Sequence, residues 1–251
     1  MSNKPLPVKL NKEPLIEVLC AVHFSSDVPA ESLLPGLLLS KLATPNPKIE
    51  PLGAAQLPQV IRDNDPNLQN APLMRILVDD QHFILIGSRW LAVGCQIPYS
   101  GWSEYKKTII SVFSILGDAG FVKNIERHSL RYVDFIKSQD APSSLSIFDL
   151  KINIAGRPLD KEQTQLRTEI IDPDFLHAIT IISKANLNKP GESAIEGVLL
   201  DVDTHRVQSM SPNEFKEGLN DFLEAIHSSN KKIFFDLLSD FGLERLEPIY
   251  D

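Results

Sequence analysis

The stretch LMRILVDDQHFILIGSRWLAVGCQI, residues 73–97, contains three short apolar runs separated by two polar breaks. The breaks, Asp79-Asp80 and Gly87-Ser88, have the composition of tight turns, so the runs predict an antiparallel three-stranded meander. After the meander, apolar residues recur at helical spacing from Trp102 to Leu116, with Ser100 as the expected helix cap. A meander followed by a packed amphipathic helix predicts the α+β class, built of antiparallel sheets with packed helices.

The segments on either side extend this pattern. Residues 15–24 alternate as a strand, and a short leucine-rich helix is expected at residues 33–42, capped by Ser26 or Asp27. Six prolines in residues 44–72 predict an irregular surface loop. Five further stretches predict strands, at residues 121–137, 145–154, 164–171, 175–184 and 194–207.

The last element has the clearest signals. Ser211 and Glu214 form a capping box with Pro212 at the first helical position. The apolar stripe that starts at Phe215 keeps its phase across residues 228–230, which predicts one long helix or two abutting ones. The order of elements therefore suggests two similar halves of strands, meander and helix, residues 1–120 and residues 121–251. A single compact unit is the alternative.

Composition limits the classes of partner. The chain has 251 residues and is 43% hydrophobic, enough for a sizeable core. It carries 33 acids against 25 bases, a net charge of −8, and free nucleic acid is therefore not expected as a partner. Cys20 and Cys95 have no metal-type spacing and predict buried reduced thiols. No stretch has the length of a membrane span or a secretory signal, so we expect a cytoplasmic protein without membrane contact.

Several short motifs occur together in a fixed order. They are KEPLIEV at residues 12–18, VHF at 22–24, PYSGWSEY at 98–105, LRYVDFI at 130–136, LLDVD at 199–203, and AIH at 225–227 followed by FF at 234–235. In this order they resemble a sporadically distributed family of uncharacterised bacterial proteins of about 250 residues. The resemblance implies asparagine where this chain has Asp134, and a basic residue where it has His23. Its patchy distribution implies a context of defence-associated or toxin-associated genes.

One candidate ligand site lies on the strand expected at residues 121–137. Arg127, His128, Arg131 and Tyr132 are close together there, and two arginines on one strand face can hold a phosphate or carboxylate. The favoured alternative is structural, with an internal arginine paired to a nearby acid such as Glu126, Glu169 or Asp134.

A candidate metal site lies on the strand expected at residues 194–207. Alternation puts Asp201, Asp203 and His205 on one face, and two carboxylates with an imidazole can bind a divalent cation. The favoured alternative is a solvated strand face. No second metal-binding motif supports the site, so no cofactor is expected.

These observations favour a non-enzymatic binding or regulatory protein that acts through a protein partner, for example a basic one, or through self-association. The sequence contains no nucleophile elbow, phosphate-binding loop or dinucleotide fingerprint, and no catalytic residue is assigned. Acids on the final helix, from Glu214 to Glu224, lie beside its aromatic stripe and offer a face for a basic partner. The alternative is a metal-dependent hydrolase or sensor of a phosphorylated small molecule, using the two candidate sites.

Overall fold

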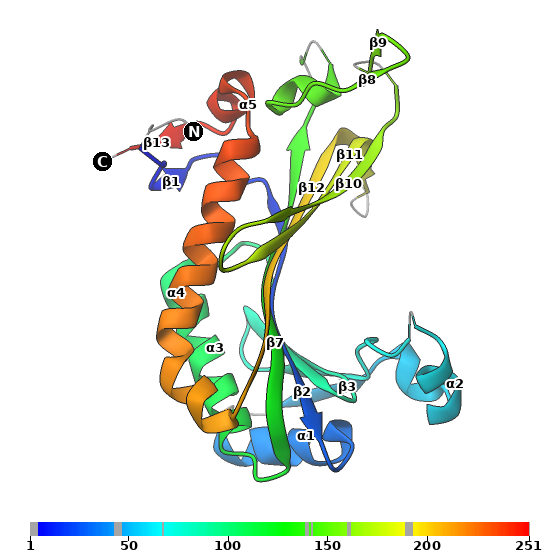
Figure 1. Ribbon diagram of the computed structural model, residues 1–251, viewed down its shortest axis with the longest axis vertical. Coiled ribbons are helices and arrows are strands. Elements are labelled where there is room, and N and C mark those ends of the chain that lie inside the picture. Colours follow the sequence, from blue (N-terminus) through cyan, green and yellow to red (C-terminus); the bar gives the residue numbers. More distant parts are fainter. Residues whose placement is uncertain are drawn as a thin grey trace. The chain divides into compact units, whose positions relative to one another are not determined.

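A computed structural model describes residues 5–42, 47–66, 68–138, 141, 143–159, 162–188 and 193–250. Helices and antiparallel strands are mixed within them, which confirms the predicted α+β class (Figure 1). Nine strands form one sheet in the order β10-β11-β12-β7-β2-β6-β5-β4-β3. No helix in the described ranges is long and apolar enough to cross a membrane.

The chain divides into two compact units, each assembled from separate segments. The meander unit comprises Glu17–Leu130 and His205–Ile226. The terminal unit comprises Met1–Ile16, Arg131–Thr204 and His227–Asp251. The division of the sequence into two similar halves, residues 1–120 and 121–251, stays a prediction.

The predicted meander is confirmed in the meander unit. Strands β4 (Met74–Leu77), β5 (His82–Ile86) and β6 (Trp90–Cys95) pair antiparallel in chain order. Strand β2 (Leu15–Ser26) pairs antiparallel with β6 on the other side. The even-numbered residues of β2 from position 18 to 24 are buried, as its alternation predicts, and Cys20 and Cys95 are buried free thiols.

Helix α3 (Trp102–Gly117) buries the stripe expected from its spacing, and the hydroxyl of Tyr105 donates to the carbonyl of Val93 at 2.6 Å. The predicted Ser100 cap is wrong. Gly101 occupies the N-cap with a φ of 85°, a left-handed conformation that suits glycine, and no side chain caps the helix. The hydroxyl of Ser100 instead lies 3.1 Å from Nε2 of His82.

The segment between β2 and β4 differs most from prediction. Helix α1 (Ala30–Lys41) starts earlier than expected, and its N-cap is Pro29 without a side-chain hydrogen bond, so neither Ser26 nor Asp27 caps it. The proline-rich segment carries strand β3 (Lys48–Pro51), the short 3₁₀ helix η1 (Gly53–Gln56) and helix α2 (Gln59–Asn64). Pairing of β3 with β4 gives this segment a backbone partner that residue periodicity does not reveal.

The terminal unit is built on long strands. Strands β7 (Val122–Lys137) and β12 (Ile195–Met210) contribute to both units, whereas β10 (Gln165–Ile171) and β11 (Leu176–Leu187) pair antiparallel within this one. The strand predicted at residues 145–154 is wrong. That segment forms a 3₁₀ helix, η2 (Ser144–Ile147), and only a two-residue strand, β8 (Asn153–Ile154), paired with β9 (Arg157–Pro158).

The C-terminal region completes the terminal unit. Helix α5 (Asp240–Arg245) is followed by β13 (Pro248–Ile249), which pairs with β1 (Lys9–Leu10). The core of the unit is one cluster of buried apolar residues: Ile136, Leu145, Ile147, Phe148, Ile179, Ile181, Val198, Leu200, Val202, Ile233, Leu238 and Leu246.

The final predicted helix is one continuous element, α4 (Pro212–Leu237). Its capping box is confirmed, because the backbone N–H of Ser211 donates to Glu214 at 2.8 Å and that of Glu214 donates to the Ser211 hydroxyl at 3.2 Å. The Ser-Ser-Asn segment does not break the helix. Asn230 is buried there, and its amide donates to the carbonyl of Val202 and to the hydroxyl of Thr204.

Candidate functional site

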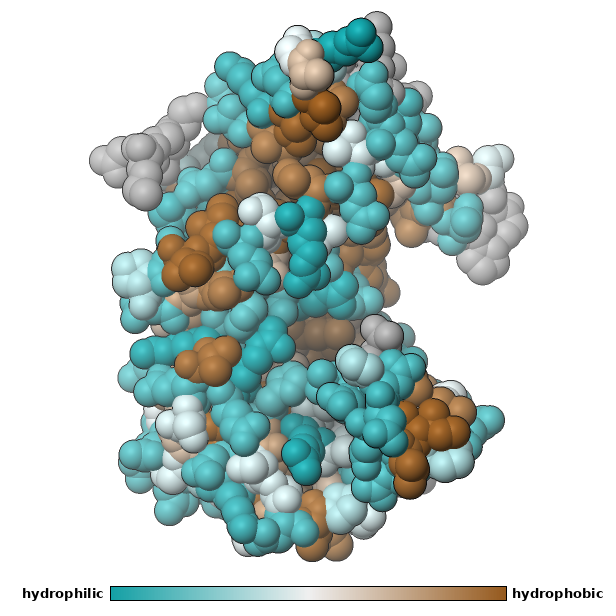
Figure 2. All heavy atoms as spheres, turned by 45° about the vertical axis from the view of Figure 1, so that its right-hand side comes forward, coloured by the Kyte–Doolittle hydropathy of each residue, from teal (hydrophilic) through white to brown (hydrophobic). Residues whose placement is uncertain are grey.

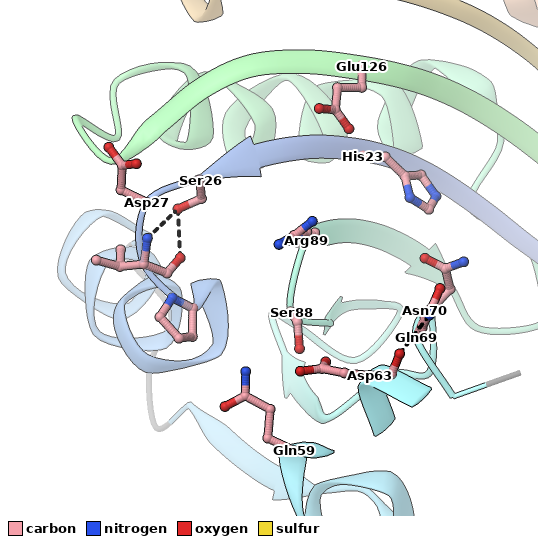
Figure 3. A pocket seen from close by; sticks show the side chains of 12 residues that line it. His23, Ser26, Asp27, Gln59, Asp63, Gln69, Asn70, Ser88, Arg89 and Glu126 are labelled. Atoms are coloured by element: carbon pink, nitrogen blue, oxygen red, sulfur yellow. Dashed lines mark hydrogen bonds between the residues drawn. The ribbon is translucent and has the colours of Figure 1, made fainter. Parts of the chain in front are cut away.

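A polar pocket of about 630 Å³ opens in the meander unit (Figure 3). Three separate parts of the chain form most of its wall: the end of β2 with the turn before α1, the α2 region, and the turn between β5 and β6. Glu126 of β7 also lines it. The lining residues are His23, Ser26, Asp27, Val28, Pro29, Gln59, Asp63, Gln69, Asn70, Ser88, Arg89 and Glu126.

Local hydrogen bonds hold these parts of the wall in place. The backbone N–H of Phe24 donates to the carbonyl of Arg89 at 3.0 Å, and that of Ala30 donates to Ser88 at 3.3 Å. The hydroxyl of Ser26 bonds to the backbone of Val28, which shapes the turn before α1. The pocket wall is therefore fixed by backbone contacts around β2.

The α2 region is tied to the wall through a second set of contacts. The amide of Gln69 donates to the backbone carbonyl of Asp63 at 2.8 Å. Arg62 lies 3.7 Å from Glu31 of α1, and the hydroxyl of Ser88 donates to the same carboxylate at 3.2 Å.

Charges of both signs face the pocket. Asp27 is paired with Lys123. Asp63, Arg89 and Glu126 are exposed, and none of the three forms an ion pair within the described ranges. With two unpaired carboxylates and one guanidinium, the pocket is acidic overall at neutral pH, and its amides add donors and acceptors.

His23 does not add positive charge at pH 7. Its ring stacks with that of Trp90 at a centroid distance of 6.3 Å. Burial, with smaller contributions from the nearby Arg127 and His205, lowers its pKa from 6.5 to about 4. His23 is therefore a neutral group in the pocket that can both donate and accept a hydrogen bond.

An apolar patch on and next to α2, here called the α2 patch, consists of Leu57, Val60 and Ile61. Their exposed fractions are 38%, 70% and 49%. Figure 2 shows hydrophobic atoms gathered on the part of the surface where Figure 1 has α2. Gln59 and Asp63 of the same helix line the pocket, so an apolar and an acidic surface adjoin.

The four predicted ligand residues lie on strand β7, and the boundary between the two units falls between them. Arg127 and His128 belong to the meander unit, and Arg131 and Tyr132 to the terminal unit. His128 is 5% exposed, its ring stacks on Phe222, and neither ring nitrogen has a hydrogen-bond partner within the described residues. Burial, aided by nearby Arg206, Arg127 and His205, lowers the pKa of His128 to about 4.

Arg131 follows the structural alternative, with a partner that the sequence did not suggest. Its Nε and Nη2 donate to the two carboxylate oxygens of Asp201, each at 2.9 Å. The ring of Tyr132 lies against that of His227, with a centroid distance of 6.4 Å.

The predicted metal ligands alternate on β12 as expected: Asp201, Asp203 and His205 are half-buried, and the residues between them, Val202 and Thr204, are buried. Asp201 and Asp203 belong to the terminal unit and His205 to the meander unit. Among the residues that the structure describes, no group of three or more histidine, cysteine or acidic side chains is arranged to hold a metal ion. The metal site stays a prediction.

The acidic face expected on α4 is partly used inside the meander unit. Glu224 accepts hydrogen bonds from Lys106 and from the indole of Trp102, and Glu214 serves the capping box. The pocket itself was missed, because its side chains converge from segments up to about a hundred residues apart. The run Arg62-Asp63-Asn64-Asp65 was the one local signal of a charged surface in the proline-rich segment.

No protein-family model matches the sequence, and a search of curated proteins found no match either.

Proposed function

We propose that this chain is a non-enzymatic binding or regulatory protein that acts through a protein partner, and that the pocket and the α2 patch form the contact. The observation that carries the proposal is the exposure of Val60 and Ile61, 70% and 49%, on the same helix as the unpaired carboxylate of Asp63, which lines the pocket. Adjoining apolar and charged surface is typical of protein interfaces, in which an apolar centre has a polar rim.

The charges of the pocket indicate the chemistry of the partner. Asp63 and Glu126 favour a lysine or arginine side chain, whereas Arg89 favours a carboxylate at the same contact. The predominance of acids in the pocket and in the whole chain favours a basic partner. In the context implied by the family resemblance, a basic toxin or nuclease has the matching charge.

Co-purification with matched variants tests this proposal. A partner protein should co-purify stoichiometrically with the native chain, and Val60→Asp or Asp63→Lys should abolish its recovery. Val207→Asp is the control, because Val207 is 76% exposed in the same unit and lines neither surface. Recovery unchanged by the first two substitutions, or a chain that stays without partner under all native conditions, would contradict the proposal.

A metal-dependent hydrolase or a sensor of a phosphorylated small molecule is the second candidate. One observation favours it: Arg127 and His205 lie close enough to His23 to contribute to its lowered pKa, so a guanidinium and two imidazoles are near one another in the meander unit. Thermal-shift measurements with inorganic phosphate, nucleotides, Mg²⁺ and Mn²⁺ test it. A stabilisation that Arg127→Met removes would support it, and no shift with any of these ligands would exclude tight binding of them.

A further inference from the structure

Strand β10 is the terminal strand of the nine-stranded sheet, and its outer edge has no strand partner within the described residues (Figure 1). Six of its seven residues are exposed. It contains no proline, and its seven consecutive registered pairs with β11 show no bulge. Long regular edges of this kind are templates for pairing with another strand, and natural proteins usually block them.

The hydrogen-bond pattern shows which backbone groups face outward. Ser183 N–H donates to the carbonyl of Thr164 at 2.9 Å, and Asp172 N–H donates to Phe175 at 2.8 Å, at the two ends of the β10–β11 ladder. In an antiparallel pair alternate residues bond to the same neighbour, so the even-numbered residues of β10 bond to β11. The N–H and C=O groups of Gln165, Arg167, Glu169 and Ile171 therefore point to the open edge.

The sequence of β10 is complementary to itself when read in the opposite direction. In QLRTEII, Thr168 is the centre, with Arg167 and Glu169 at equal distances on either side. Both charged side chains are mostly exposed, 68% and 54%, and only 3.9 Å separates them within one strand. Leu166 and Ile170 likewise lie at equal distances from Thr168, on the other face of the strand.

We propose that two copies of this chain pair antiparallel through β10, about a twofold axis that passes through Thr168. In this register each Arg167 lies opposite Glu169 of the other copy, and each Leu166 lies opposite Ile170 on the other face. The directly paired residues with outward backbone groups are then Gln165 with Ile171 and Arg167 with Glu169. All four outward positions find partners, and the seven-residue strand is paired over its whole length.

The neighbouring registers are less favourable. The outward backbone groups belong to odd-numbered residues, so the register shifts in steps that keep odd residues paired with odd residues. A shift in one direction places Arg167 opposite Arg167, and a shift in the other places Glu169 opposite Glu169. Directly opposed like charges destabilise a strand pair, so the charges of β10 select the register centred on Thr168.

Charge reversal in the full chain tests the pairing, with mass measured by light scattering or sedimentation over a range of concentrations. The native chain should show a concentration-dependent dimer. Arg167→Glu should place glutamates opposite one another and Glu169→Arg should place arginines opposite one another, so each variant alone should be a monomer. The double variant Arg167→Glu/Glu169→Arg should dimerise again, and a mixture of the two single variants should form a heterodimer. A native chain that is a monomer at every concentration, or a dimer insensitive to both reversals, would overturn the proposal.

Cysteine cross-linking tests the register separately. Thr168 faces its own copy at a non-hydrogen-bonded position, where Cα atoms are about 4.5 Å apart, within disulfide range. Thr168→Cys should therefore give a covalent dimer on mild oxidation, whereas Gln165→Cys, which faces Ile171, should not. The native Cys20 and Cys95 are buried, so the native chain gives the background level of disulfide cross-linking. Cross-linking of Gln165→Cys without that of Thr168→Cys would show a different register and overturn the one proposed. Because both test positions are exposed on an edge strand, thermal unfolding should confirm that each variant is folded.

Discussion

The guanidinium of Arg131 on β7 holds both carboxylate oxygens of Asp201 on β12, with Nε–Oδ1 and Nη2–Oδ2 distances of 2.9 Å. The side chains are 39% and 20% exposed. This pair joins a residue of the predicted ligand site to a residue of the predicted metal site. Among arginine–carboxylate pairs, the planar two-point geometry contributes most to the stability of the fold.

The first prediction concerns the energy of this pair. In a double-mutant cycle with Arg131→Met and Asp201→Asn, urea unfolding should give a coupling of about 1 kcal/mol, the upper end for partly exposed pairs. Lys232 and Asp236 on α4 give the matched control, a single-point pair whose side chains are 52% and 45% exposed. Its coupling should be smaller, about 0.3–0.5 kcal/mol. Equal couplings for the two pairs would show that two-point geometry adds nothing here.

The second prediction concerns Asp134, which is 5% exposed. Burial, with smaller contributions from Asp201 and Glu13, raises its pKa from 3.8 to about 8. Between these values the folded chain keeps a proton that the unfolded chain has lost, so stability falls as pH rises, by up to about 1.4 kcal/mol per pH unit. Asp134→Asn should therefore be more stable than the native chain at pH 8, while the two should be similar below pH 4.

Chemical unfolding at several pH values measures the difference. The variant Asp201→Asn loses the pair with Arg131 at every pH, but its stability should decline less steeply between pH 4 and 8, since the Asp201 carboxylate contributes to the raised pKa of Asp134. A native chain whose stability does not decline between pH 4 and 8 relative to Asp134→Asn would contradict a protonated Asp134. Protonation makes this side chain mostly neutral at pH 7.

The third prediction concerns His128, which lies against Phe222 without hydrogen-bond partners for its ring among the described residues. Since its pKa is about 4 in the fold against 6.5 unfolded, it lowers stability progressively as pH falls from 6.5 toward 4. His128→Leu should be neutral or stabilising by about 1 kcal/mol at pH 7, because it removes unsatisfied polar groups. Its advantage should grow at pH 5, as thermal unfolding can measure. A loss of stability at pH 5 would mean that the imidazole has a partner.

The fourth prediction concerns a buried network in the terminal unit. The carboxylate of Asp172 accepts from Nε2 of His177 at 3.2 Å, so Nδ1 accepts from the hydroxyl of Thr204 at 2.9 Å. The oxygen of that hydroxyl in turn accepts from the amide of Asn230 at 2.9 Å. Thr204→Val should cost about 1–3 kcal/mol, because it leaves buried groups on both sides unpaired.

Thr204→Ser is the control for this network, because it retains the hydroxyl and should cost clearly less than the valine variant. Burial lowers the pKa of His177, although Asp172 partly opposes the shift, so the native network should weaken as pH falls below 6.5. Urea unfolding at pH 7 and pH 5 compares the variants. A loss for the serine variant with none for the valine variant would indicate that packing of the methyl group, and not the hydroxyl, stabilises this site.

Part of this architecture could be read from local signals. The meander of β4, β5 and β6, the stripe of α3 and the capping box of α4 each follow from patterns within a few residues. The predictions of a Ser100 cap and of a strand at residues 145–154 were wrong, because contacts with residues distant in sequence decide the structure at both places. Ser100 bonds to His82 of a neighbouring strand, and the backbone of Ile147 in η2 accepts from Ser239, which is distant in sequence.

The candidate site divides in the same way. The sequence indicated Arg131 as a possible ligand-binding residue and Asp201 as a possible metal ligand. Their pairing depends on the positions of two strands, because the two residues are seventy positions apart in the chain. The pocket depends on Arg89, Asp63 and Glu126 meeting from three segments, which no spacing in the chain encodes.

The sequence by itself determined the α+β class, the meander, the two amphipathic helices and the acidic charge, because periodicity, turn composition and caps act over short distances. Only the tertiary structure decided which carboxylates are paired, which are protonated and which are left unpaired at a surface. Those properties depend on burial and on neighbours brought together by folding. The single residue Asp134 shows the difference: its place in a strand follows from its neighbours in sequence, and its raised pKa follows from burial and, to a smaller extent, from Asp201 and Glu13 in space.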